Sequence, residues 1–299
     1  MSKNYYIIPV FISHQGCPHQ CVFCNQDRIA GKYEEVFAND VRKIIDEYLE
    51  TINSKGATIE VSFFGGTFTA IDVNKQKELL EVAREYKQKG LIHKIRLSTR
   101  PDAILPYILG YLKEYKVDII ELGVQSLDDE VLRKAGRGHS VNDVIVASKL
   151  IKEAGFTLGH QIMPGLPGDS FEIDIETTKK SIEMKPDICR IYPSLVIKDT
   201  PMEDMYNRGD YVPYSLDEAV YISGEMLKLY NEAKIKVIRI GLQPTDTITT
   251  GKDIVDGPFH PAFRELVEGH LICETLDKKC PKEKDIIVEI NEKDISKLY

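Results

Sequence analysis

Three cysteines, Cys17, Cys21 and Cys24, stand close together near the start of this 299-residue chain. Clustered cysteines in a cytosolic protein indicate a metal site rather than disulfides. An iron–sulfur cluster that only carries electrons normally has four thiolate ligands. The C-x3-C-x2-C spacing supplies three, which predicts a cluster with one iron open to a substrate or cofactor.

Two other interpretations of these cysteines stay open. One is a structural zinc site completed by a fourth ligand such as His14 or His19. The other is that all three are ordinary buried thiols. The remaining cysteines lie far away along the chain: Cys189 falls in a strand pattern and is expected in the core, and Cys273 and Cys280 have no convincing partner.

A glycine pair follows the apolar run Thr58–Phe64, in the order Gly65-Gly66-Thr67. Glycine lets the backbone approach a ligand closely. The plainer alternative is a tight turn between a strand and a helix.

Short apolar runs alternate with longer amphipathic segments along the whole chain. The expected strands are 7–12, 58–64, 93–98, 119–124, 157–163, 188–195 and 236–240. The expected helices are 39–53, 73–89, 103–115, 141–154, 172–184 and 215–233, with Asn39 capping the first and Ser215 the last. This alternation predicts an α/β fold with a parallel sheet, whose ligands gather at the carboxyl ends of the strands.

The composition suits a cytoplasmic enzyme. Asp and Glu outnumber Lys and Arg by 47 to 39, a net charge of −8, which disfavours a broad nucleic-acid-binding face. No apolar run approaches the roughly 18 residues of a transmembrane helix, and the N-terminus lacks a signal-peptide core. We expect a core domain over residues 1–240 and a C-terminal extension over 241–299 whose completeness is left open.

The cysteine motif, just after the first strand, resembles the signature of the radical S-adenosylmethionine (SAM) superfamily, and the glycine pair strengthens the likeness. An ordered series of further motifs resembles the radical SAM domain of the Elongator catalytic subunit, a tRNA wobble-uridine modifying enzyme. The series includes Ser98-Thr-Arg-Pro-Asp102, Glu121-Leu-Gly-Val-Gln-Ser126, Arg137-Gly-His-Ser140 and Ile162-Met-Pro-Gly-Leu-Pro-Gly168. The likeness runs from about Tyr6 to about Ala233.

This resemblance implies a partial (β/α)6 TIM-like barrel that holds a [4Fe–4S] cluster on Cys17, Cys21 and Cys24 and binds SAM at the open iron. Reductive cleavage of SAM would give a 5′-deoxyadenosyl radical. The implied SAM contacts are Gly65, Gly66, Thr67, Ser98, Gln125, Arg137 and Gln161.

Some of these contacts match other members of the superfamily. Gln125 and Arg137 resemble the pair that holds SAM in oxygen-independent coproporphyrinogen oxidases. Ser98 stands where relatives often carry Glu, and Gln161 where those oxidases use Asp on the ribose.

Compared with the Elongator family, we expect this chain to lack the acetyltransferase domain and the basic N-terminal extension. One expected partner is a reductant such as ferredoxin or flavodoxin. A second possible partner is tRNA, although the net charge of −8 does not support it. Two alternatives stay open: the same chemistry on a porphyrin-like small molecule, and a non-catalytic metal-binding interaction module.

Overall fold

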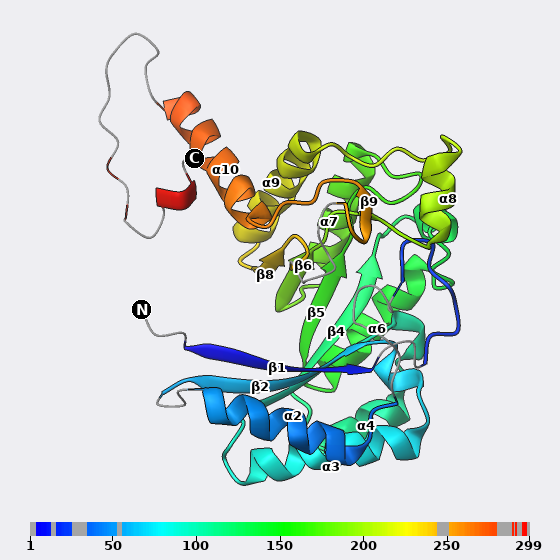
Figure 1. Ribbon diagram of the computed structural model, residues 1–299, viewed down its shortest axis with the longest axis vertical. Coiled ribbons are helices and arrows are strands. Elements are labelled where there is room, and N and C mark those ends of the chain that lie inside the picture. Colours follow the sequence, from blue (N-terminus) through cyan, green and yellow to red (C-terminus); the bar gives the residue numbers. More distant parts are fainter. Residues whose placement is uncertain are drawn as a thin grey trace.

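A computed structural model of the chain describes residues 4–12, 16–25, 35–52, 56–243, 251–279, 289, 291 and 295–297. Its centre is a parallel sheet of seven strands. Neighbours in this sheet follow the order β1 (Tyr5–Ile12), β2 (Thr58–Gly65), β3 (Lys94–Thr99), β4 (Ile119–Gln125), β5 (Thr157–Ile162), β6 (Ile188–Ile191) and β8 (Lys236–Ile240). The sheet curls into a half-barrel with β1 and β8 at its two edges (Figure 1), which confirms the predicted α/β, TIM-like class.

Helices cover the outer face of the half-barrel (Figure 1). They are α2 (Ala38–Thr51), α3 (Val73–Gln88), α4 (Pro106–Glu114), α6 (Val141–Glu153), α7 (Phe171–Glu183) and α9 (Leu216–Glu232). The short helix α5 (Asp129–Lys134) packs instead against Val22 and Phe23, and α10 (Phe263–Lys279) packs against α9 and β8. Ser215 caps α9 as expected, through a capping box with Glu218. The cap predicted at Asn39 is wrong: α2 begins at Ala38, and Asp40 accepts a hydrogen bond from the backbone N–H of Phe37.

The alternation of side chains along the strands separates the core from the interior of the half-barrel. On β1, Ile8, Val10 and Ile12 are buried in the hydrophobic core beneath the helices. Cys189 on β6 is fully buried in the same core, as expected. The opposite face of the sheet carries polar and charged side chains toward the inside of the barrel, including Glu60 and Glu121, which are both buried.

The segment after β6 differs from the sequence-based expectation. The expected strand 188–195 ends at Ile191, and the chain then forms β7 (Val196–Ile197), which pairs antiparallel with β9 (Ile254–Asp256). A short helix, α8 (Pro201–Asn207), follows, with Thr200 as its N-cap. We call residues 196–211 the α8 segment; it lies beside the cysteine-bearing loop at one end of the barrel (Figure 1).

No helix among the described residues is long and apolar enough to span a membrane. The domain boundary expected at residue 240 stays a prediction, and Cys280 lies outside the described residues.

Candidate functional site

One cavity of about 620 Å³ opens at the carboxyl end of the sheet. Its size falls within the range of about 300–1,000 Å³ that is typical of small-molecule sites. All ten residues predicted for the cluster and for SAM line it, namely Cys17, Cys21, Cys24, Gly65, Gly66, Thr67, Ser98, Gln125, Arg137 and Gln161. The fold therefore brings together side chains that are up to 144 positions apart, from 17 to 161, in one place.

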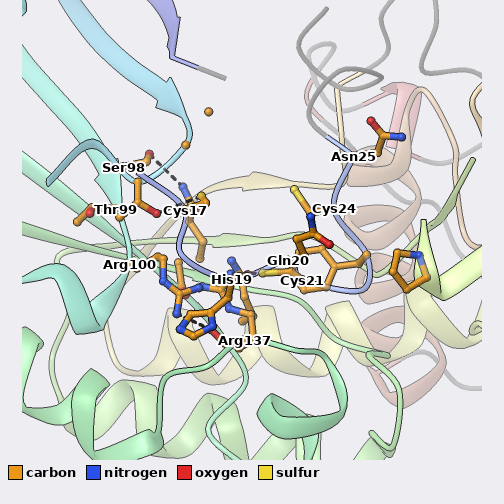
Figure 2. Close-up of a pocket in the computed structure, with 18 of the residues that line it drawn as sticks. Cys17, His19, Gln20, Cys21, Cys24, Asn25, Ser98, Thr99, Arg100 and Arg137 are labelled. Carbon is orange, nitrogen blue, oxygen red and sulfur yellow. Dashed lines mark hydrogen bonds between the residues drawn. The ribbon is translucent and has the colours of Figure 1, made fainter. Parts of the chain in front are cut away.

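The cysteine loop, residues 16–25, is anchored on both sides of this cavity. The thiol of Cys17 lies 3.2 Å from Thr67 Oγ1, in hydrogen-bond contact, and Cys21 Sγ accepts a hydrogen bond from Arg137 Nη1 at 3.1 Å. The backbone N–H of Val22 donates to the carbonyl of Ala135 at 3.0 Å. Figure 2 shows the three cysteines on this one loop, between Ser98 and Thr99 on one side and Asn25 on the other.

The α8 segment holds the far end of the cysteine loop. Asn25 Nδ2 donates to the carbonyl of Lys198 at 3.1 Å, and Met202 N donates to the carbonyl of Val22 at 2.9 Å. Val22 and Phe23 pack against Met202 and its neighbours in a small hydrophobic cluster. Sequence reasoning missed this support, because its only local signal was the Thr200-Pro201 helix start.

Within the described residues, no group of three or more His, Cys, Asp or Glu side chains is drawn together closely enough to hold a single metal ion. Four ligands of one tetrahedral zinc would stand about 3.8 Å apart, because each Zn–S bond is about 2.3 Å. Thiolates on different irons of a cube stand wider apart than that. Of the two candidates for a fourth zinc ligand, His14 lies outside the described residues, and His19 lines the cavity with its ring against Gly138.

The glycine pair joins the end of β2 to the end of β1. Gly65 has a φ of +104°, and a Cβ there would lie 3.0 Å from the backbone carbonyl of Ile12. Gly66 N donates to the same carbonyl oxygen at 2.8 Å. Side chains are therefore excluded at Gly65, and the backbone faces the cavity directly, as the predicted close approach to a ligand requires.

Gln125 ends β4 in a strained conformation. Its φ is +68°, which is costly for a residue with a side chain, and the register with β5 shifts between Gly123 and Gln125. The residue is buried, and within the described part of the chain its Oε1 has no hydrogen-bond partner. Strain and an unsatisfied buried acceptor at one residue are typical of functional sites.

Arg137 reaches the cavity from the loop after α5. Besides its bond to Cys21, it donates from Nη2 to the carbonyl of Gly123 at 2.6 Å, while its buried Nε finds no partner among the described residues. Burial and the guanidiniums of Arg137 and Arg100 lower the pKa of His139 to about 3. The wall here thus carries positive charge, which suits a carboxylate or a thiolate.

Arg100, within the Ser98–Asp102 motif, also lines the cavity. It forms a bidentate ion pair with Asp102, with both distances 2.9 Å, and donates to the carbonyl of Arg137. Arg100 therefore supports the Arg137 loop as well as the cavity wall.

Ser98 and Gln161 form another part of the wall, on β3 and β5. Gln161 Nε2 donates to Glu121 Oε2 at 3.0 Å, and Ser98 Oγ lies 3.5 Å from the same oxygen. Glu121 lies behind them, 1% exposed, and is not part of the cavity lining. Although burial opposes it, Arg190 and Arg96 hold the pKa of this carboxyl below its usual value, so Glu121 is ionised.

These features fit a cluster with SAM better than they fit a plain strand-end turn. The three thiols share one cavity wall with glycine backbone and with a guanidinium. Two buried polar atoms beside them, Gln125 Oε1 and Arg137 Nε, lack partners among the described residues, and a bound ligand would satisfy them.

The chain matches protein families and individual proteins that are already known. The model of the family described as the radical SAM superfamily matches residues 11–180, and that of the Radical_SAM C-terminal domain matches residues 186–272. A tRNA uridine(34) acetyltransferase of Methanocaldococcus infernus is 29% identical over 313 residues, which cover 92% of this chain but 58% of that protein. An uncharacterized protein of Methanocaldococcus jannaschii is 34% identical over 227 residues, 72% of this chain and 68% of its own length.

Among solved structures, the archaeal Elp3 of Methanocaldococcus infernus, with its N-terminus deleted, superposes with a TM-score of 0.69 at 26% identity. The match covers 93% of this chain and 64% of that one. The chain thus spans little more than half the length of the acetyltransferase it matches, over the radical SAM region. On these matches, the chain belongs to the radical SAM superfamily of enzymes.

Proposed function

We propose that this enzyme holds a [4Fe–4S] cluster on Cys17, Cys21 and Cys24, cleaves SAM reductively, and modifies a nucleoside in tRNA. The observation that carries the proposal is the single cavity lined by all ten residues implicated in the cluster and in SAM. When bound, a cluster of this kind supplies the electron that breaks a carbon–sulfur bond of SAM.

The residues of the chain would share the work of binding. The backbone at Gly65, Gly66 and Thr67 would accept and donate hydrogen bonds at the methionine end of SAM. Arg137 would pair with the methionine carboxylate through its unused Nε, a geometry that its planar guanidinium favours. Gln125 would offer its unpartnered Oε1 to the SAM ammonium group.

Ser98 and Gln161 would bind the ribose from the part of the cavity wall formed by β3 and β5. Both lie at the carboxyl ends of their strands and line the cavity. Their hydroxyl and amide groups can exchange hydrogen bonds with sugar hydroxyls.

The tRNA part of the proposal is supported by the relatives, several of which are named tRNA uridine(34) acetyltransferases. The match covers only 58% of the first of these relatives, so acetyl transfer by the whole relative is not part of the proposal for this chain. The net charge of −8 gives tRNA no general electrostatic attraction and makes a small-molecule substrate the second candidate. A ferredoxin or flavodoxin as electron donor, and a cytoplasmic location, complete the proposal.

The test is anaerobic reconstitution with iron and sulfide, followed by measurement of 5′-deoxyadenosine formed from SAM under reductant. Wild-type protein should form it, and Cys24→Ala should not. Cys273→Ala is the matched control, because Cys273 is an exposed thiol on α10 outside the cavity, and it should behave as wild type. Equal product from Cys24→Ala and wild type would reject the radical chemistry.

The substrate is tested in the same assay with and without total tRNA. Product formation that tRNA stimulates, together with tRNA binding that weakens as salt rises, supports the RNA substrate. If tRNA neither binds at low salt nor changes the rate, the RNA substrate is rejected and the small-molecule candidate takes its place.

A further inference from the structure

The inside of the half-barrel contains a row of buried charges that reaches the cavity wall through Glu121. The row runs across four strands, through Glu60 on β2, Arg96 on β3, Glu121 on β4 and Arg190 on β6; we call these four residues the buried charge network. All four are at most 7% exposed. Ion pairs buried this deeply add little net stability, since removing two charges from water costs about as much as their attraction returns.

Glu121 uses its two oxygens for different purposes. Oε1 accepts from Arg190 Nε at 2.9 Å and from Arg96 Nη1, so one oxygen is clamped by two guanidiniums. Oε2 faces the cavity wall and accepts from Gln161 Nε2 at 3.0 Å. The carboxylate thus joins the buried charge network to a residue that lines the cavity.

The neighbouring strand leaves room for this carboxylate. Gly159 on β5 is the register partner of Glu121, and a Cβ at Gly159 would lie 2.7 Å from Glu121 Cγ. The backbone of Gly159 is not in the left-handed region, so its lack of a side chain serves space rather than conformation.

The contact decides which way the Gln161 amide faces. An ionised carboxylate can only accept hydrogen bonds, so it must face the NH₂ group of Gln161. The same nitrogen, Gln161 Nε2, also donates to Ser98 Oγ at 3.4 Å. With its NH₂ group bound to Glu121 and Ser98, Gln161 can offer its carbonyl oxygen as a fixed acceptor to a donor group on a ligand in the cavity.

We propose that Glu121 is a positioning residue for SAM: clamped by Arg96 and Arg190, it holds the Gln161 amide in one orientation at the cavity wall. This inference rests on the proposed SAM site. Nothing in the chemistry of cleavage passes through Glu121, which acts only by fixing its neighbour.

Glu60 provides a matched control within the same network. It is fully buried and accepts from Arg96 Nη2 at 2.9 Å and from Ser62 Oγ at 2.5 Å, but neither it nor these partners line the cavity. Glu60→Gln and Glu121→Gln therefore remove the same charge, at similar burial, on nearby strands. Only Glu121→Gln loses the carboxylate that orients a cavity residue.

The experiment measures the Kd of SAM by calorimetry on the anaerobically reconstituted protein, with thermal unfolding of each variant alongside. Both substitutions should lower the Tm. Glu121→Gln should raise the Kd about tenfold, the lower end of what outer-shell substitutions cost at metal sites, while Glu60→Gln stays within about twofold of wild type. In a Gln161→Ala background the effect of Glu121→Gln on the Kd should vanish, because the two residues act as one unit.

Should Glu121→Gln not fold, Gly159→Ala displaces the carboxylate without removing a charge and should raise the Kd in the same way. A Kd in Glu121→Gln or Gly159→Ala equal to that of wild type would overturn the inference, as would an equal rise in Glu60→Gln. Wild-type protein that does not bind SAM at all would instead overturn the proposed function, and the inference with it.

Discussion

Replacing Gly16 by alanine should prevent the cluster from assembling while the protein still folds. Gly16 opens the cysteine loop with a φ of +73°, which costs a residue with a side chain about 1–2 kcal/mol. An added Cβ would also lie 2.3 Å from the carbonyl oxygen of Thr67 and 2.8 Å from the backbone N of Ile71. Both are backbone atoms that cannot swing away, and such overpacking costs about 1–3 kcal/mol more.

The combined penalty of about 2–5 kcal/mol exceeds the hydrogen bond of about 0.5–1.5 kcal/mol that holds Cys17 to Thr67. The start of the cysteine loop should therefore move away from the backbone of Thr67 and Ile71. Because the cysteine loop contributes no strand to the sheet and no residue to the main hydrophobic core, we expect local displacement rather than unfolding.

The assay for Gly16→Ala is iron and sulfide content after anaerobic reconstitution, with thermal unfolding of the unloaded protein. Gly90→Ala is the control, because Gly90 has a φ of +71° and nothing within 4 Å of an added Cβ. It should lose some stability but load as wild type does. If Gly16→Ala loads as much iron and sulfide as Gly90→Ala, the packing argument is wrong.

Three further predictions follow from single residues. Gln125→Gly should raise the unfolding free energy by about 1 kcal/mol, because glycine adopts the positive φ at this position without strain, and it should weaken SAM binding. A denaturant titration in which the variant is less stable than wild type would show that Gln125 is not strained. Arg137→Leu should lower the reduction potential of the cluster, on the order of tens of millivolts, because it removes a donor to Cys21 Sγ; an unchanged potential in a redox titration would contradict this. Burial raises the pKa of Asp169 to about 6 beside the buried carboxyl of Asp174, so the folded state holds this proton more tightly than the unfolded state does. The stabilisation by protonated Asp169 is complete below about pH 4 and is lost as the pH rises through about 6. Asp169→Asn should therefore be more stable than wild type at pH 8, by about 1–3 kcal/mol. Urea titrations at pH 8 that show no gain in stability would contradict this.

The parts of the site that depend on local sequence were predictable. The cysteine spacing, the glycine pair and the motifs carrying Gln125 and Arg137 each lie within a few residues, next to a strand whose apolar pattern is clear. In a parallel sheet the carboxyl ends of the strands lie at one edge, so the motifs that follow these strands lie close together. Residues from each of these motifs line one cavity there.

The parts that depend on distant contacts were not predictable. Asn25 meets Lys198 across 173 positions, and no local pattern marks the α8 segment as the support of the cysteine loop. In the sequence, Glu121 was only one residue of a strand motif. Its role as a positioning residue depends on its register with Gly159 and on its hydrogen bond with Gln161, which the sequence does not show. The Asn39 cap failed for a local reason: the helix begins at Ala38, and Asp40, three residues after the N-cap Phe37, accepts the hydrogen bond from the backbone N–H of Phe37.

The central claim is that three thiolates hold a cluster whose remaining iron is open to SAM. The most direct measurement is electron paramagnetic resonance of the reduced, reconstituted protein during a titration with SAM, with iron and sulfide counted on the same sample. We expect about four irons and four sulfides per chain and a cluster signal that changes as SAM binds. Bound zinc in place of iron, or a cluster signal that SAM leaves unchanged at saturating concentration, would contradict it.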